Sequence, residues 1–212
     1  MASTPYDLIV SLGANCQPAH HIRRVTGTKT AQIFDWCVTP DRALCHAIRN
    51  GFDNWFDPEC LVPHGDGGYL HKETKVFFLH EFAQHPDFET GYSANAERIE
   101  RRILRWHSLA GSGKRVLFIR QHVSETSARK AAAALVAALV ASTNLSFDLL
   151  YLVKPAMRLP FWKMRGVTFR HNRPKGPDED WRGYDSDWDA HFASMGVAKL
   201  DDLGLGNADK SY

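Results

Sequence analysis

The chain has 212 residues, of which 44% are hydrophobic and 24% are charged, a composition typical of an ordinary globular protein. The formal net charge is only +2, and basic residues are mixed with acidic ones, so the sequence favours neither nucleic acid nor an anionic membrane as a partner. No run of about 20 apolar residues is present to span a bilayer.

The N-terminal residues MASTPYDLIV lack the basic region and following apolar stretch of a signal peptide, so we expect a cytoplasmic protein. Its cysteines are then expected to be reduced thiols. The adjacent His20 and His21 point to different helix faces, and no CxxC pair is present, so the sequence predicts no metal site. It predicts no cofactor either. The four cysteines are Cys16, Cys37, Cys45 and Cys60.

The beginning of the chain predicts a strand, a tight turn and a helix. Residues 6–12 form a short apolar run of the kind found in strands, and Gly-Ala-Asn at 13–15 ends it. Ala19, Ile22 and Val25 then follow at helical spacing, with a proline in the first turn, where its missing N–H costs nothing.

The next part of the chain predicts a second strand and a second helix, followed by an irregular stretch. Residues 31–37 have the pattern of a short strand. A helix is expected to begin at residues 39–41 and to end at Gly51. Residues 52–73 are rich in aromatic residues, glycine and proline, which predicts loops.

The remainder of the chain alternates apolar strands with helices. Apolar strands in this arrangement predict an α/β fold with a mainly parallel sheet and helices on both faces. No repeat or linker divides the chain, so we expect one domain over residues 1–212, partly irregular at 174–212. The expected strands are 75–82, 115–120, 147–153 and 167–171, and the expected helices are 95–109, 125–142 and 188–195.

The first turn of the first predicted helix is the best candidate for a functional centre. Cys16 lies there, where free N–H groups and the helix dipole are expected to lower the pKa of its thiol. Gly13 permits close backbone approach, and with Asn15 it is expected to bind a substrate oxyanion or phosphate. Arg102 and Arg120 either hold an anionic substrate group or make buried salt bridges. The competing interpretation is that Cys16 is a small buried hydrophobe.

Several residues at or near predicted strand ends are candidate partners for this thiol, because sites in open parallel sheets form outside the carboxyl ends of the strands. His80 is the candidate base; the alternatives are His122, near a predicted strand end, and His191, in the C-terminal DWDAH stretch on the last predicted helix. Asp35 is either a partner carboxylate or the N-cap of a turn.

The motifs occur in a recognisable order: SLGANCQPAHHIRR, FDWCVTP, HEF, an Arg-Arg helix and LFIR. From about residue 8 to residue 153 the chain resembles an uncharacterised bacterial family described as papain-like cysteine peptidases. The resemblance implies a cysteine-dependent hydrolase of the peptidase or amidase type, with Cys16 as nucleophile and His80 as its base. Its substrate would be a small molecule, a glycan or a peptide.

Two other functions stay open at this point. The strand-turn-helix beginning also looks like esterases and acyltransferases whose nucleophile follows the first strand and whose base is a C-terminal histidine. On that interpretation the protein transfers acyl or glycosyl groups in surface-polysaccharide assembly, with His191 as base. On the third interpretation the helix N-terminus only binds an anion, and Cys16 is structural.

Overall fold

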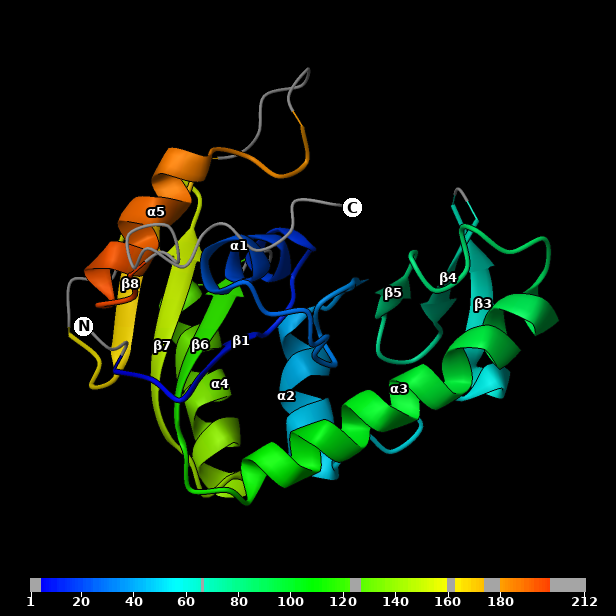
Figure 1. Ribbon diagram of the computed structural model, residues 1–212. Helices are drawn as coiled ribbons and strands as arrows, with labels where there is room; N and C mark the ends of the chain where they lie inside the picture. Colours follow the sequence, from blue (N-terminus) through cyan, green and yellow to red (C-terminus); the bar gives the residue numbers. More distant parts are fainter. Residues whose placement is uncertain (1–4, 66, 123–126, 160–162, 174–179, 199–212) are drawn as a thin grey trace.

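Two four-stranded sheets organise the molecule (Figure 1). The computed structural model describes residues 5–65, 67–122, 127–159, 163–173 and 180–198. The first sheet has the order β1-β6-β7-β8, and every neighbouring pair in it is parallel. This confirms the predicted α/β class and the mainly parallel sheet. Its strands are β1 (Leu8–Ser11), β6 (Arg115–Gln121), β7 (Ser146–Val153) and β8 (Val167–His171).

Helices cover both faces of the parallel sheet, as predicted, because its central strands carry apolar side chains on both sides. On β6, Leu117 packs in one cluster with Ile22 and Trp188, whereas Phe118 packs in another with Leu139. The first cluster lies under α1 and α5, and the second lies under α4 with α2 beside it. The bounds of these helices are α1 (Gln17–Thr26), α2 (Asp41–Asn50), α4 (Ala128–Ser142) and α5 (Asp185–Ser194).

The second sheet is antiparallel, with the order β2-β5-β4-β3, and the sequence did not predict it. Part of it comes from residues 52–73, for which only loops were expected. That expectation is wrong, because the short 3₁₀ helix η1 (Pro58–Cys60) leads into a β-hairpin there. The four strands are β2 (Cys37–Val38), β3 (Leu61–His64), β4 (Gly68–His71) and β5 (Phe77–Phe78).

Two predicted strands are much shorter than expected. Residues 33–36 form a turn instead of a strand, because the Asp35 carboxylate accepts the backbone N–H of Gln32 and closes the chain on itself. The strand expected at 75–82 pairs only at β5, and residues 80–84 form a turn. Since β2 and β5 pair antiparallel, the turn before β2 and the turn after β5 place polar side chains at the same end of this pair of strands.

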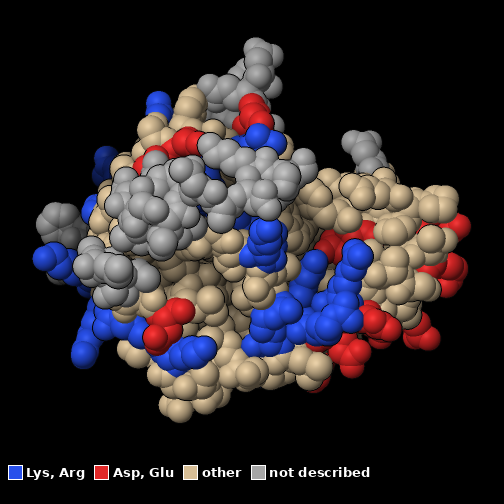
Figure 2. All heavy atoms as spheres, in the orientation of Figure 1, with Lys and Arg blue, Asp and Glu red and all other residues tan. Residues whose placement is uncertain are grey.

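The helix α3 (Phe88–Ala110) connects the two sheets (Figure 1). It begins seven residues before the predicted start at Asn95, since the Asp87 carboxylate caps it by accepting the N–H of Thr90 at 2.8 Å. Lysine and arginine side chains gather over the middle of α3 (Figure 2). Among the described residues, no helix has the length and apolarity needed to cross a membrane.

The remaining predicted elements agree with the structure within a few residues. The helix expected at 125–142 is α4, and the described part of the chain resumes after residues 123–126. The last helix begins at Asp185 rather than at Trp188. Of the irregular C-terminal stretch, residues 174–179 and 199–212 lie outside the described residues.

Candidate functional site

The turn between β1 and α1 presents Cys16. It passes through Gly13 and Ala14 with φ angles of 71° and 84°. A Cβ on Gly13 would lie 3.1 Å from both the carbonyl oxygen of Phe34 and Oγ1 of Thr39, so a side chain there would be crowded as well as strained at this positive φ. Ala14 is buried in a left-handed conformation that costs an alanine about 1–3 kcal/mol, a strain of the kind found at functional turns. Cys16 follows as the N-cap of α1.

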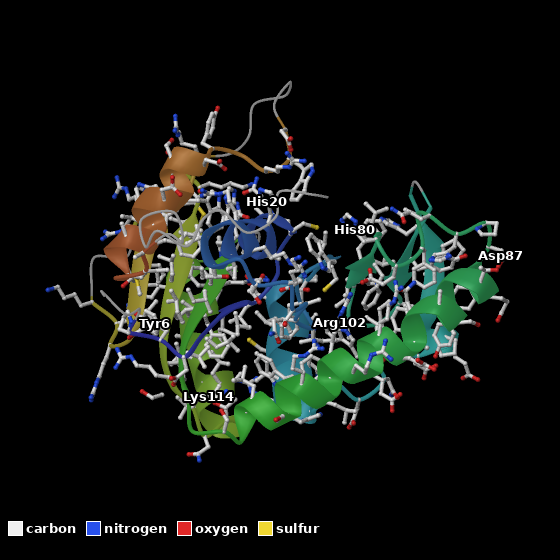
Figure 3. The ribbon with its side chains drawn as sticks, in the orientation of Figure 1. Tyr6, His20, His80, Asp87, Arg102 and Lys114 are labelled. Carbon is white, nitrogen blue, oxygen red and sulfur yellow. The ribbon has the colours of Figure 1, made fainter. Side chains whose placement is uncertain are left out.

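The Cys16 thiol lies against the imidazole of His80. The distance from Sγ to Nε2 is 3.2 Å, within hydrogen-bond reach of sulfur, although the two residues are 64 positions apart. His80 lies on the turn after β5, between α1 and the second sheet (Figure 3). Its ring packs edge-to-face on Trp36, and the guanidinium of Arg23 lies 4.9 Å from the centre of the Trp36 ring.

The turn that carries His80 is held by α3. The carboxylate of Glu81 is buried and accepts a hydrogen bond from Arg102 at 3.1 Å. Nδ2 of Asn95 donates to the backbone oxygen of Glu81 at 2.7 Å. Arg102, labelled on α3 in Figure 3, therefore makes the buried salt bridge that the sequence left open as an alternative, and it does not line the cavity that holds Cys16.

The expected lowering of the Cys16 pKa is wrong. Burial raises the pKa of Cys16 from its usual value to about 11, and the carboxylates of Glu81 and Asp35 add to the rise. The helix N-terminus offers less than expected, because the N–H of Gln17 already donates to Oδ1 of Asn15 and Pro18 has none. With this pKa, only about one Cys16 side chain in ten thousand is a thiolate at pH 7. A neighbouring group must therefore accept the thiol proton if Cys16 is to react as a nucleophile.

Asp35 lies close to this centre but is engaged elsewhere. Its carboxylate accepts the N–H of Gln32 at 2.8 Å and lies 3.8 Å from the guanidinium of Arg23. Within the described ranges it makes no hydrogen bond to His80. Burial raises the pKa of Asp35 to about 6, against the hydrogen bond from Gln32 and the nearby arginines, which lower it.

The raised pKa of Asp35 predicts an unusual pH dependence of stability. Between pH 3.8 and about 6 the folded protein takes up a proton at Asp35 while the unfolded chain stays ionised, so stability falls as the pH rises through this window. Ionisation of Asp35 across this window is expected to lower the free energy of unfolding by ~3 kcal/mol. Asp35→Asn keeps an oxygen acceptor for Gln32 but cannot ionise, so we expect this pH-dependent loss to be absent in the variant. Urea unfolding of both proteins at several pH values from 4 to 7 measures it. A constant difference between them across that range would contradict the prediction.

Cys16 and His80 open onto a cavity of about 540 Å³. Most of its other lining residues were not singled out as site residues, although Gln121, Val153 and Asn172 lie at the carboxyl ends of three parallel strands or directly after them. The signal that could have found them is the rule that sites in open parallel sheets form outside the carboxyl ends of the strands. The lining consists of Asn15, Cys16, Gln17, Leu79, His80, Gln121, His122, Val153, Lys154, Asn172 and Trp181.

The alternative bases occupy different positions. His122 lines the cavity, with Nδ1 2.9 Å from the hydroxyl of Tyr151. His191 does not line it; its Nε2 lies 3.3 Å from Oδ1 of Asn172, which separates it from the cavity. Arg120 is fully buried and also absent from the lining. Of the predicted residues, Cys16, His80, Asn15 and His122 therefore share one cavity.

The two adjacent histidines meet after all. His20, His21 and Asp185 bring potential metal-ligand atoms within 4.8 Å of one another, which corrects the expectation that His20 and His21 point apart. The positively charged guanidinium of Arg24 lies between these groups. Its Nε is 3.2 Å from Nδ1 of His21 and 3.3 Å from Oδ1 of Asp185. These side chains thus form a salt-bridged joint between α1 and α5.

Comparisons with known proteins agree with the resemblance found in the sequence. Residues 7–153 match a family described as "Putative papain-like cysteine peptidase". An uncharacterised protein of Acanthamoeba polyphaga mimivirus is 29% identical over 139 residues, covering 53% of this chain. The chain spans about 60% of the length of that viral relative. No solved structure shows significant similarity to the chain.

Proposed function

This chain belongs to the family described as papain-like cysteine peptidases, and on that premise we propose that it is a cysteine-dependent hydrolase of amide or ester bonds. Cys16 is the nucleophile and His80 is the base. The observation that carries the proposal is the 3.2 Å separation of Sγ and Nε2 at the edge of a 540 Å³ cavity. A nucleophile and base in direct contact beside a substrate-sized space is the usual arrangement for acyl transfer.

The reaction begins from the protonated thiol of Cys16, because burial holds its pKa well above 7. As Sγ of Cys16 attacks the acyl carbon, Nε2 of His80 takes the thiol proton and then gives it to the leaving amine or alcohol. The product is a thioester on Cys16. A water molecule then attacks the thioester while His80 accepts one of its protons, and that proton returns to the sulfur as the carboxylic acid leaves. The thiol is regenerated and the net reaction consumes one water.

Asn15 is the proposed donor to the oxygen that becomes negative during the attack. Its Oδ1 accepts the N–H of Gln17 at 3.0 Å, which leaves Nδ2 as the end of the amide available to a ligand. The side chain lines the same cavity as the thiol. A preorganised donor of this kind stabilises the developing charge more than water does.

Arg102 and Arg120 act indirectly on this proposal. Arg102 holds Glu81 and thereby the turn that carries His80, so it is a positioning residue. Arg120 holds the turn of Gly13 in place by donating a hydrogen bond to the carbonyl oxygen of the preceding residue, Leu12.

All four cysteines are free thiols, which fits the cytoplasmic location proposed for the protein, where thiols stay reduced.

Acylation by p-nitrophenyl acetate tests the proposal. We expect a burst of p-nitrophenol equal to the enzyme concentration and one acetyl group on the peptide that contains Cys16, located by mass spectrometry. Cys60→Ala, which removes a buried cysteine at η1, serves as the matched control and should react like the unmodified protein. Acetylation elsewhere, or an equal burst from Cys16→Ala, would refute the assignment of the nucleophile.

A further inference from the structure

Two amide side chains in the lining of the Cys16 cavity each have one buried atom with no hydrogen-bond partner among the described residues. These atoms are Oε1 of Gln121, which is an acceptor, and Nδ2 of Asn172, which is a donor. Asn172 is only 4% exposed. Buried polar atoms nearly always find partners, so an unpaired donor and an unpaired acceptor in one cavity indicate a ligand that supplies both.

The orientation of Gln121 is set by a relay of amides. Nε2 of Gln17 donates to the carbonyl oxygen of Trp181 at 2.6 Å, so its Oε1 remains as an acceptor. That oxygen accepts from Nε2 of Gln121 at 3.3 Å. Because the nitrogen end of Gln121 is used in this way, the end left for a ligand is its oxygen.

The orientation of Asn172 is set from the opposite side. Oδ1 of Asn172 lies 3.3 Å from Nε2 of His191, and since an amide oxygen only accepts, the imidazole is the donor in this arrangement. Burial lowers the pKa of His191, which favours the neutral form of its ring. The backbone N–H of Asn172 donates to the carbonyl oxygen of Val153 at 2.8 Å and fixes the residue to the end of β7. The end of Asn172 left for a ligand is therefore its NH₂ group.

We propose that Gln121 and Asn172 bind a neutral carboxamide of the substrate. The N–H of the carboxamide donates to Oε1 of Gln121, and its C=O accepts from Nδ2 of Asn172. A carboxylate ligand has no proton to donate to Gln121, and its negative charge would lie against the side-chain oxygen of Gln121. It should therefore bind more weakly than a carboxamide. The inference rests on the proposed function in one respect: the carboxamide belongs to the molecule whose bond Cys16 attacks.

Binding to full-length Cys16→Ala protein tests this without requiring turnover. We expect phenylacetamide to bind at least about tenfold more tightly than phenylacetate, which lacks the donor and is charged, or N,N-dimethylphenylacetamide, which lacks only the donor. Chemical-shift titration measures the three dissociation constants. Equal binding of either analogue would overturn the proposal, and all three ligands are compared on one protein in which Gln121 and Asn172 are unchanged.

Two variants in the same background assign the contacts. Gln121→Met removes the acceptor and Asn172→Leu removes the donor at nearly constant size, and each is expected to weaken phenylacetamide about 5- to 10-fold. The matched controls are Gln84→Met and Asn144→Leu, exposed amides outside the cavity, which should leave the affinity unchanged. Unaltered binding in both lining variants would overturn the proposal.

The outcomes separate this proposal from the hydrolase proposal. Selective amide binding without acetylation of Cys16 would refute the hydrolase and leave the carboxamide site standing. Acetylation of Cys16 with no preference for phenylacetamide would refute the carboxamide site and leave the hydrolase proposal standing.

Discussion

Replacement of His80 by alanine is expected to slow acylation of Cys16 at pH 7 by about 10²- to 10⁴-fold. The thiol has a pKa of about 11 and lies 3.2 Å from Nε2 of His80, so loss of the imidazole removes the group that accepts its proton. Without it, only the small thiolate fraction reacts. Single-turnover release of p-nitrophenol from p-nitrophenyl acetate measures the rate.

The pH dependence identifies the cause of this loss. In His80→Ala the rate should rise about tenfold per pH unit towards pH 11, because each unit increases the thiolate fraction tenfold, whereas the unmodified protein should depend on pH much less steeply. His85→Ala is the matched control, since His85 lies nearby but is not in the cavity lining. A His80→Ala rate equal to the unmodified rate at pH 7 would rule out His80 as the base.

Replacement of Arg120 by methionine is expected to lower the free energy of unfolding by about 3–5 kcal/mol. The guanidinium is fully buried and donates to Oδ1 of Asp41 from Nε and Nη2, at 3.1 and 2.7 Å. It also donates to the carbonyl oxygens of Leu12 and Thr39, at 2.8 and 2.7 Å. Methionine leaves a carboxylate and two carbonyl groups without their donor. Urea denaturation measures the loss.

Two further variants separate charge from geometry at this position. Arg120→Lys keeps the charge but cannot reach all three acceptors at once, so an intermediate loss is expected. Arg120→Met combined with Asp41→Leu should recover part of the stability, because no buried charge then lacks a partner. A loss below about 1 kcal/mol in the single methionine variant would show that the network is not needed for stability.

The site also shows why some candidates in the sequence were easier to place than others. Cys16 and Asn15 follow from the first strand and the first helix, because both elements have strong local patterns and the site lies at a strand end. The pKa of Cys16 did not follow, since burial and two carboxylates distant in sequence outweigh the helix N-terminus. Whether a buried arginine such as Arg120 binds substrate or a carboxylate depends on its neighbours, and local sequence does not reveal those.

The sequence by itself determined the α/β class, the parallel sheet and the thiol at the beginning of α1, because periodicity and turn residues are local properties of the chain. Only the tertiary structure decided what surrounds that thiol. The second sheet has strands of two to four residues, too short to leave a periodic signal, yet the turn of His80 follows directly after its strand β5. The contact of Cys16 with His80 and the unpaired amides of Gln121 and Asn172 arise from packing between elements far apart in sequence, which no local pattern encodes.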